Sequence, residues 1–459
     1  MNVPRVVIAG AQSGVGKTTV SIGLMTVLKE AGFRVQAFKI GPDYIDPSHH
    51  RVATGRPSEN LDSWMVAEDQ IIELFTRAAK GADIAVIEGV MGLYDGISGL
   101  DETGSTAQIA EILRCPVILI IDAYNVARTA AAIVLGYKKF DENVNIAGVV
   151  LNRVTGETHA VWCKEAIEST VKIPVVGWLP VNKEIELPER HLGLIPTPET
   201  EEFNAIYPKI RNFFRTRINL NMIVDIARSA GEIPEVQHPI YPSRKSVKSV
   251  AIGLAFDEAF NFYYQSNINL LEAYGAEIKC FSPIHDGELP AEIDGLYIGG
   301  GFPEMLPKEL EANKHLREAI KKAAEEGMPI YGECAGLMYL TDSITDFDGE
   351  SYDMVGVLKG KTLMTQKTLV IYSLAEATRD TLLCRAGSQL RGHEFHNSVI
   401  TDIPSDAEFA YAMKMGEGTK DKKDGWMQYN VLASYMHIHF AQNPKIVKTF
   451  IVNCKKHKF

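Results

Sequence analysis

The first half of the chain alternates short apolar runs with longer stretches in which apolar residues recur every three or four positions. The short runs predict buried strands at 6–9, 34–38, 84–87, 116–121, 146–151 and 174–178. The longer stretches predict helices at 20–31, 70–80 and 107–113. Strands that are apolar throughout and alternate with helices are typical of a parallel sheet covered on both faces.

The pattern weakens between 201 and 247, where proline and polar residues predict a linker. A second series of apolar runs follows, at 249–255, 277–281, 295–298 and 328–331. After residue 350 the runs become shorter and alternate with polar residues, as in antiparallel edge structure. We therefore predict an α/β protein with an N-terminal parallel-sheet domain (1–200), a linker (201–247) and a second α/β domain (248–459).

Composition excludes several classes of protein. The net charge of −11, with no basic cluster, argues against nucleic acid as the main partner. The six cysteines are scattered without a C-x-x-C pair, which argues against a disulfide framework or a zinc site. A strand pattern from Arg5 onward leaves no room for a signal peptide, and no apolar run is long enough to span a membrane. We therefore expect a cytoplasmic protein.

A glycine-rich loop follows the first predicted strand. Residues 10–19 read G-A-Q-S-G-V-G-K-T-T, which matches the phosphate-binding P-loop except for Ala11 at the first glycine position. The pattern predicts that Lys17 neutralises phosphate charge and that Thr18 contacts Mg²⁺, with Gly14, Gly16 and Thr19 completing the nucleotide-binding loop. The alternative is a glycine turn of an unrelated α/β fold, which the strand, lysine and threonine together disfavour.

Acidic residues follow two further strands. Segment 38–47 carries Lys39, Asp43 and Asp46 on a turn, and Glu88 ends the third strand. Ligands of open α/β sheets bind at the carboxyl ends of the strands, and Mg²⁺ prefers oxygen ligands. Thr18, Glu88 and one of the two aspartates would therefore be enough to hold Mg²⁺. The alternative is that Asp43 or Asp46 caps a turn.

A second set of candidate residues lies in the other half of the chain. Cys334 lies in a G-x-C-x-G turn after the apolar run 328–331, and such a turn presents a thiol for attack on a carbonyl. The amino end of a following helix would lower the pKa of the thiol. Gly300 and Gly301 end a strand and would donate backbone N–H groups to an oxyanion. The alternative is that Cys334 is a small buried residue.

These motifs carry a family resemblance. GAQSGVGKT, FKIGPDYIDP, IEGVMGLYDG and LPERHLGL resemble the a,c-diamide synthases of cobalamin and related tetrapyrrole biosynthesis. Their amino domains resemble dethiobiotin synthetase and, more remotely, MinD-type ATPases, whose signature lysine is replaced here by Gln12. The resemblance implies that MgATP phosphorylates a substrate carboxylate and that ammonia then displaces the phosphate.

The resemblance also implies roles for individual residues. Lys39 would assist the transferred phosphoryl group, and Asn152 would contact the adenine edge unless it merely caps a loop. Arg190 and His191 belong to a family motif without an assigned mechanism. The neighbourhood of substrate and catalysis would comprise Asp43, Tyr44, Ile45, Asp46 and Glu88, with Thr18, Asp46 and Glu88 as metal ligands.

The second half resembles class I glutamine amidotransferase domains of the cobyric acid synthase type. In that resemblance His437 matches the base that takes the proton of Cys334. Most class I glutaminases follow this histidine with Pro-Glu, whereas Ile438 and His439 stand here. We therefore expect no complete triad, slow glutamine hydrolysis in isolation and a supporting role for His439.

Together these features predict a ligase with glutamine, ATP and a tetrapyrrole polycarboxylate as small-molecule substrates and Mg²⁺ as cofactor. The substrate expected is cobyrinic acid, amidated on its a and c acetate groups, with Arg51, Arg56 and Arg153 as candidate contacts. Ni-sirohydrochlorin and hydrogenobyrinic acid are alternative macrocycles. An alternative from another class is a P-loop scaffold ATPase with an inert glutaminase-like domain. The sequence leaves the oligomeric state open, with a homodimer among the options.

Overall fold

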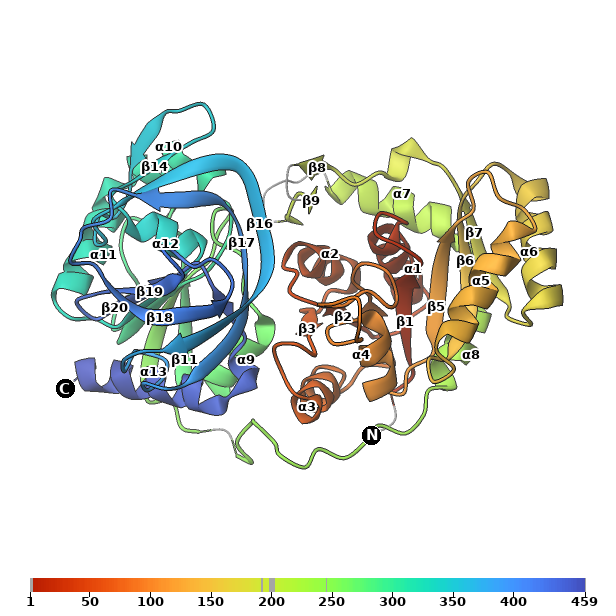
Figure 1. The fold of residues 1–459 in the computed structure, drawn as a ribbon, viewed down its shortest axis with the longest axis horizontal. Coiled ribbons are helices and arrows are strands. Elements are labelled where there is room, and N and C mark those ends of the chain that lie inside the picture. The colour runs from red at the N-terminus through yellow and green to blue at the C-terminus, as the bar shows by residue number, and fades with distance from the viewer. Residues whose placement is uncertain (1–2, 191–192, 198–202, 245, 459) are drawn as a thin grey trace. The chain divides into compact units, whose positions relative to one another are not determined.

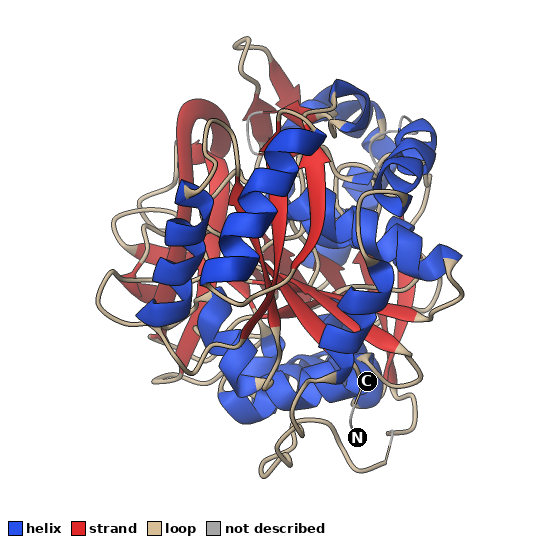
Figure 2. Ribbon diagram, turned by 90° about the vertical axis from the view of Figure 1, so that its right-hand side faces the viewer, coloured by secondary structure: helices blue, strands red, loops and turns tan. Residues whose placement is uncertain are grey.

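The computed structural model describes residues 3–190, 193–197, 203–244 and 246–458. The chain divides into two compact units, Met1–Pro239 and Ile240–Phe459. Each unit combines helices with a central sheet, so the predicted α/β class is confirmed (Figures 1 and 2).

The first unit is built on a seven-stranded sheet in the order β3-β2-β4-β1-β5-β6-β7. Every pairing in this sheet is parallel, as the apolar runs predict. The strands are β1 (Arg5–Gly10), β2 (Val35–Ile40), β3 (Glu59–Leu61), β4 (Ile84–Glu88), β5 (Val117–Asp122), β6 (Ile146–Val154) and β7 (Val175–Pro180). The short strand β3 is not predicted by the apolar pattern, because it contains only three residues.

Helices of the first unit connect these strands and cover the sheet (Figure 2). They are α1 (Lys17–Glu30), α2 (Ile45–Thr54), α3 (Glu68–Ala78), α4 (Thr106–Ile112), α5 (Thr129–Phe140) and α6 (Glu157–Thr170). Helix α2 lies where the sequence predicts a turn. It forms because the Asp43 carboxylate accepts hydrogen bonds from the first backbone N–H groups, those of Ile45 and Asp46, and because proline is tolerated in a first turn.

The predicted linker 201–247 is only partly extended in the structure. Two helices occupy its first half. Helices α7 (Phe203–Arg215) and α8 (Leu220–Arg228) belong to the first unit and bury apolar faces in its core. The ring of Phe214 packs directly over α1, where a Cβ added to Gly23 would lie 2.4 Å from it. The apolar residues recur at helical spacing, and burial of that face stabilises the helices. The extended segment is therefore shorter than expected.

The second unit contains a 12-stranded sheet. Its first part is parallel, with neighbours in the order β11-β10-β12-β13-β20, and the remainder is mainly antiparallel. The strands are β10 (Val250–Ala255), β11 (Ala276–Phe281), β12 (Gly295–Ile298), β13 (Ile330–Glu333), β14 (Ser343–Thr345), β15 (Ser351–Asp353), β16 (Lys361–Ala377), β17 (Gln389–Thr401), β18 (Glu408–Met415), β19 (Lys423–Gln428), β20 (Val431–Ser434) and β21 (His437–Ile438).

The strands after residue 350 are mainly antiparallel, as expected, although β20 pairs in parallel with β13 and β16 with β14. Two of the later strands are longer than the earlier ones rather than shorter. Strands β16 and β17 have 17 and 13 residues and pair with each other. Helices of this unit are α9 (Gln265–Ala273), α10 (Pro307–Ala312), α11 (Lys314–Glu325), α12 (Ala335–Leu340) and α13 (Pro444–Lys458). Among the described residues, no helix is long and apolar enough to cross a membrane.

Part of the motif LPERHLGL lies in a small antiparallel pair, β8 (Glu189–Arg190) with β9 (Gly193–Leu194). His191 lies outside the described residues. The structure therefore adds no role for Arg190 or His191.

Candidate functional sites in the two units

The glycine-rich loop connects β1 to α1. Gly14 and Gly16 have positive φ angles of 72° and 93°, which glycine adopts without steric cost. Lys17 is largely buried, and its ammonium donates to the backbone carbonyl of Met91 at 2.5 Å. Burial and the nearby charge of Lys39 lower the pKa of Lys17. Strand, loop and helix thus have the arrangement that the P-loop pattern predicts.

Thr18, Lys39, Asp46 and Glu88 converge beside this loop from four different elements. The Thr18 hydroxyl lies 2.7 Å from Glu88 and 3.2 Å from Asp46. The Lys39 ammonium pairs with Asp46 and, at 3.0 Å, with Glu88. Both carboxylates are buried, and burial of an unpaired anion costs free energy because the anion loses its hydration. The ammonium of Lys39 offsets this cost by pairing with both.

The two buried carboxylates respond differently to this environment. Burial raises the pKa of Glu88, but the charges of Lys39 and His50 outweigh it and hold the pKa well below the usual range. Burial raises the pKa of Asp46, and the neighbouring charges of Asp43 and Glu88 raise it further. The surroundings thus favour the charged form of Glu88 more than that of Asp46, although Lys39 pairs with both carboxylates.

His50 also belongs to this cluster, although no sequence motif indicates it. Its Nε2 lies 2.7 Å from the second oxygen of Glu88, and its Nδ1 lies 3.1 Å from Ser58. Helix α2 places Asp46 and His50 one turn apart, on the same face. Spacing i, i+4 would have revealed this pair if residues 45–54 had been predicted as a helix.

Asp43, Tyr44 and Ile45 lie at the start of α2. The Asp43 carboxylate caps the helix, and its other oxygen lies 3.6 Å from Lys39. The side chains of Tyr44 and Ile45 are buried. The capping alternative therefore holds for Asp43, whereas the Asp46 carboxylate joins the Lys39 cluster.

A cavity of about 550 Å³ lies over the glycine-rich loop. It is lined by Gly14, Gly16, Lys17, Thr18, Thr19 and Asn152, among others. Cavities of this volume accommodate ligands of nucleotide size.

Asn152 fixes one side of the same loop. Its amide nitrogen donates to the carbonyl of Val15 at 2.8 Å, and its oxygen accepts from the N–H of Arg153. Arg153 pairs with Asp122 and donates to the carbonyl of Gly14. Contact of Asn152 with adenine stays a prediction, because both ends of its amide already bind the protein's own backbone.

The other two candidate arginines differ in their surroundings. Arg56 donates to Gln36 and to the carbonyls of Ala78 and Lys80, so its guanidinium holds neighbouring segments together. Arg51 lies on α2 and is exposed.

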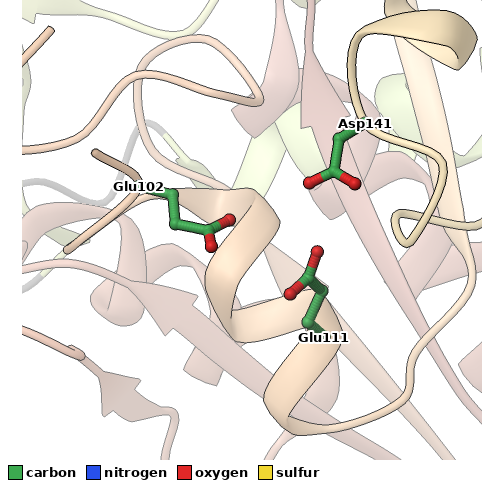
Figure 3. Close-up of side chains that lie close together, drawn as sticks. All are labelled: Glu102, Glu111 and Asp141. Atoms are coloured by element: carbon green, nitrogen blue, oxygen red, sulfur yellow. The ribbon is translucent and has the colours of Figure 1, made fainter. Parts of the chain in front are cut away.

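A separate acidic group, Glu102, Glu111 and Asp141, brings three carboxylates within 4.8 Å of one another (Figure 3). Burial and the charges of the other two acids raise the pKa of Glu111 to about 7. Repulsion is thus relieved by protonation of Glu111 near neutral pH. No other feature of these residues indicates a ligand, so we assign no metal site to them.

In the second unit, Cys334 forms a strained turn between β13 and α12. Its φ of 49° and ψ of −100° are unusual for a residue with a side chain and match the nucleophile elbow that the sequence predicts. The thiol donates to the carbonyl of Phe395 at 3.4 Å. Burial raises the pKa of the thiol, whereas the sequence predicts a lowered pKa. The difference arises because desolvation outweighs the backbone N–H of Ala335.

His437 lies in the short strand β21 and is buried. Burial lowers its pKa well below the usual range, and the charges of His393 and His396 lower it further. The imidazole of His437 stacks on that of His393, with ring centres 4.8 Å apart. A neutral imidazole can accept a proton from a thiol. His439 contacts Ser266 and the N–H of Ala441, in agreement with a supporting role.

The glycine triplet 299–301 lies next to this histidine. A Cβ added to Gly300 would lie 2.5 Å from Cε1 of His437, and one added to Gly301 would lie 2.0 Å from the carbonyl of Ala259. Only glycine fits such close approaches. The N–H of Gly300 donates to Phe262 at 3.3 Å, so an oxyanion would have to compete with this weak bond.

Sequence comparisons agree with this division of the chain. Residues 6–195 match the model of a CobQ/CobB/MinD/ParA nucleotide binding domain, and residues 251–445 match a CobB/CobQ-like glutamine amidotransferase domain. A domain of the first kind, with its P-loop, implies that the chain uses ATP.

Similar proteins match over nearly the whole chain. The chain is 45% identical to the cobyrinate a,c-diamide synthase of Dehalococcoides mccartyi strain CBDB1, over 98% of both chains. It is 46% identical to the enzyme of that name from Methanosarcina acetivorans, over 95% of this chain and 93% of the other. With Methanothermobacter thermautotrophicus the identity is 45%, over 98% and 99%. The chain therefore belongs to the cobyrinate a,c-diamide synthase family.

Proposed function

We propose that this protein amidates the a and c acetate side chains of cobyrinic acid, with glutamine as the nitrogen donor and ATP as the energy source. Family membership supports this substrate, since relatives about 45% identical over nearly full length carry that name. One observation supports the proposed chemistry most directly. The same chain contains a P-loop whose Thr18 contacts the buried carboxylate of Glu88, and a strained turn that presents the thiol of Cys334.

The residues around Thr18 fit Mg²⁺. A hydroxyl and two buried carboxylates, those of Asp46 and Glu88, lie within hydrogen-bonding distance of one another and offer the oxygen ligands that Mg²⁺ prefers. The bound ion would neutralise phosphate charge during phosphoryl transfer. Lys39 would keep the two carboxylates together, since it pairs with both.

The first reaction forms an acyl phosphate. A substrate carboxylate oxygen attacks the γ-phosphorus of ATP, and the bond from phosphorus to the leaving ADP oxygen breaks. Lys17 lies at the end of the glycine-rich loop. Its ammonium would stabilise the negative charge on the phosphoryl group during transfer. Ammonia then attacks the acyl carbon, phosphate leaves, and the nitrogen loses a proton to give the amide.

The second unit would supply that ammonia. The thiol of Cys334 attacks the carboxamide carbon of glutamine, and His437 accepts the thiol proton. His437 then protonates the departing ammonia as the carbon–nitrogen bond breaks. Water hydrolyses the remaining thioester to glutamate. Gly300 and Gly301 are the proposed donors to the developing oxyanion.

The decisive experiment incubates the purified protein with MgATP, glutamine and each candidate macrocycle, and counts added amides by mass spectrometry. Cobyrinic acid should gain two amides and consume two ATP. A gain only on Ni-sirohydrochlorin or hydrogenobyrinic acid would reassign the substrate. ATP turnover without any amide would support the scaffold ATPase.

A cytoplasmic location and a homodimer stay predictions.

A further inference from the structure

The strand that carries His437 is unusually short for an element that positions a catalytic base. Strand β21 contains only His437 and Ile438, and it pairs with β17 through His393 and Gly392. Two residue pairs form a weak ladder. Other contacts must therefore fix the orientation of the histidine.

Two buried side chains form hydrogen bonds with the backbone of Ile438. A carboxylate oxygen of Glu333 accepts a hydrogen bond from the N–H of Ile438 at 3.0 Å. The side-chain amide of Asn267 donates to the carbonyl of Ile438 at 2.9 Å and accepts from the N–H of Phe440 at 2.7 Å. Glu333 is 2% exposed and Asn267 is fully buried. The residue after His437 is thus fixed through both of its backbone groups.

Glu333 is itself fixed by two tyrosines. The hydroxyls of Tyr297 and Tyr331 each donate to its carboxylate at 2.6 Å. Asn267 is a further hydrogen-bonding partner of Tyr297, which joins the two halves of the network. A buried polar network in which each member has partners is rigid. Glu333 therefore has little freedom to leave Ile438.

The hydrogen bond between Glu333 and Ile438 links the two candidate catalytic residues, because Glu333 is adjacent to Cys334 and Ile438 is adjacent to His437. Glu333 ends β13 and directly precedes Cys334, so one short segment supplies the nucleophile and also holds the strand of the base. In class I glutaminases with Pro-Glu after the histidine, the glutamate orients the ring. Here Ile438 and His439 occupy those positions.

We infer that Glu333 and Asn267 form a clamp on Ile438 that positions His437 against Cys334 for glutamine hydrolysis. This inference rests on the proposed glutaminase function of the second unit. Glu333 is a positioning residue, because it acts through the backbone of Ile438 and does not contact the substrate. It replaces the glutamate that is absent after the histidine.

The test compares two substitutions of Glu333 in the full-length protein. Glu333→Ala removes the acceptor, and we expect kcat for glutamate release to fall about 100-fold, the scale of a 1 Å misplacement of a catalytic group. KM for glutamine should stay unchanged, and so should amidation driven by free ammonia. Glu333→Gln keeps an oxygen for Ile438 and Tyr331, and its NH₂ can donate to Tyr297, so it should restore most of kcat.

Asp294→Asn is the matched control. Asp294 is another buried carboxylate of the second unit, and it accepts from the N–H of Ala251 at 2.8 Å. This variant should leave kcat for glutamate release unchanged. An unchanged kcat in Glu333→Ala would overturn the clamp, as would a Glu333→Gln variant as slow as Glu333→Ala, because charge rather than the hydrogen bond would then be required.

If Glu333→Ala fails to fold, Asn267→Ala carries the test, since it removes the other half of the clamp. We expect the same selective fall in kcat, and an unchanged kcat would again overturn the inference. Failure of the proposed function gives a different result, because the unsubstituted protein would then amidate no macrocycle even with free ammonia. Glutamate release would still report on the clamp in that case, whereas an unsubstituted protein that releases no glutamate would overturn the proposed glutaminase and the clamp with it.

Discussion

The hydroxyl of Thr18 donates a hydrogen bond of 2.7 Å to Glu88, although 70 positions separate the two residues. The parallel sheet explains this contact. Strand β1 pairs with β4 so that Ile8 lies opposite Glu88, and the glycine-rich loop then carries the chain from β1 to Thr18 at the start of α1. The carboxyl ends of β1 and β4 lie side by side, so the Thr18 hydroxyl and the Glu88 carboxylate meet at this edge of the sheet.

Thr18→Val tests this hydroxyl with little change in volume. We expect MgATP-dependent phosphoryl transfer to fall at least about 100-fold, the scale of one lost electrostatic contact to a transition state. Thr18→Ser keeps the hydroxyl and is the matched control, with activity close to that of the unsubstituted protein. ATP turnover in the presence of the macrocycle is the measurement. Equal activity of the valine and serine variants would exclude a role for the hydroxyl.

Lys39→Met should destabilise the first unit by about 3–5 kcal/mol, because it leaves buried carboxylates without their cation. The lysine side chain is buried, and it pairs with both Asp46 and Glu88. Urea denaturation gives the change in free energy of unfolding.

The control for this substitution is Lys139→Met, which removes the exposed pair with Glu142. An exposed pair contributes little, so the free energy of unfolding should change far less than in Lys39→Met. Similar unfolding free energies for the two variants would show that the buried cluster does not depend on its lysine.

Cys334→Ala should abolish glutamine-driven amidation, a loss of at least about 10³-fold, because the proposed mechanism forms its covalent intermediate on this thiol. Amidation driven by ammonia at raised pH should remain, since the acyl phosphate forms in the other unit. Cys280→Ala, which removes an exposed thiol, should retain both activities.

Lys17→Ala completes this comparison, because it should lose amidation from either nitrogen source. In the proposed mechanism, acyl-phosphate formation precedes the use of ammonia and depends on this lysine. A folded Cys334→Ala protein that fails to use ammonia would contradict the division of labour between the two units.

The sequence predicts those site residues that lie within local motifs. Lys17, Thr18 and Cys334 follow apolar strands and precede helices, so chain order alone indicates their setting. His50 was missed because its helix begins in a segment rich in glycine, proline and aspartate, where turn signals dominate. Only tertiary packing brings this histidine to Glu88.

Glu333 was missed for another reason. As a strand residue beside the nucleophile it has no spacing that distinguishes it, and its partner Ile438 lies 105 positions away. The predicted shift in the pKa of Cys334 has the wrong direction. A motif indicates that a helix begins at this residue, but it does not indicate how deeply the thiol is buried. Desolvation depends on the assembled core.

Phe214→Ala should destabilise the protein by about 3–5 kcal/mol, the range for large aromatic deletions in cores. Phe214 is fully buried over α1, in a helix that lies within the predicted linker. Phe140→Ala is the control, since Phe140 is 75% exposed and the change should be below about 0.5 kcal/mol. A negligible effect of Phe214→Ala on urea unfolding would mean that α7 is dispensable to the core.

The pH dependence of stability tests the burial of Glu333. Burial raises its pKa to about 7, from an ordinary value of 4.5, despite the hydrogen bonds from Ile438, Tyr297 and Tyr331. The folded state therefore binds this proton more tightly than the unfolded state. Stability should be lost as pH rises from about 4.5 to about 7, with no further change from this group above that pH.

Glu333→Gln removes this ionisation, so the comparison isolates it. The free energy of unfolding of the unsubstituted protein, relative to Glu333→Gln, should fall by about 3 kcal/mol between pH 4.5 and pH 8. Asp424, whose pKa is raised to about 6 mainly by burial, is present in both proteins, and its contribution cancels. Urea unfolding at several pH values gives the difference. Parallel curves would mean that Glu333 ionises as readily in the folded protein as in water, which a carboxylate 2% exposed among tyrosines should not do.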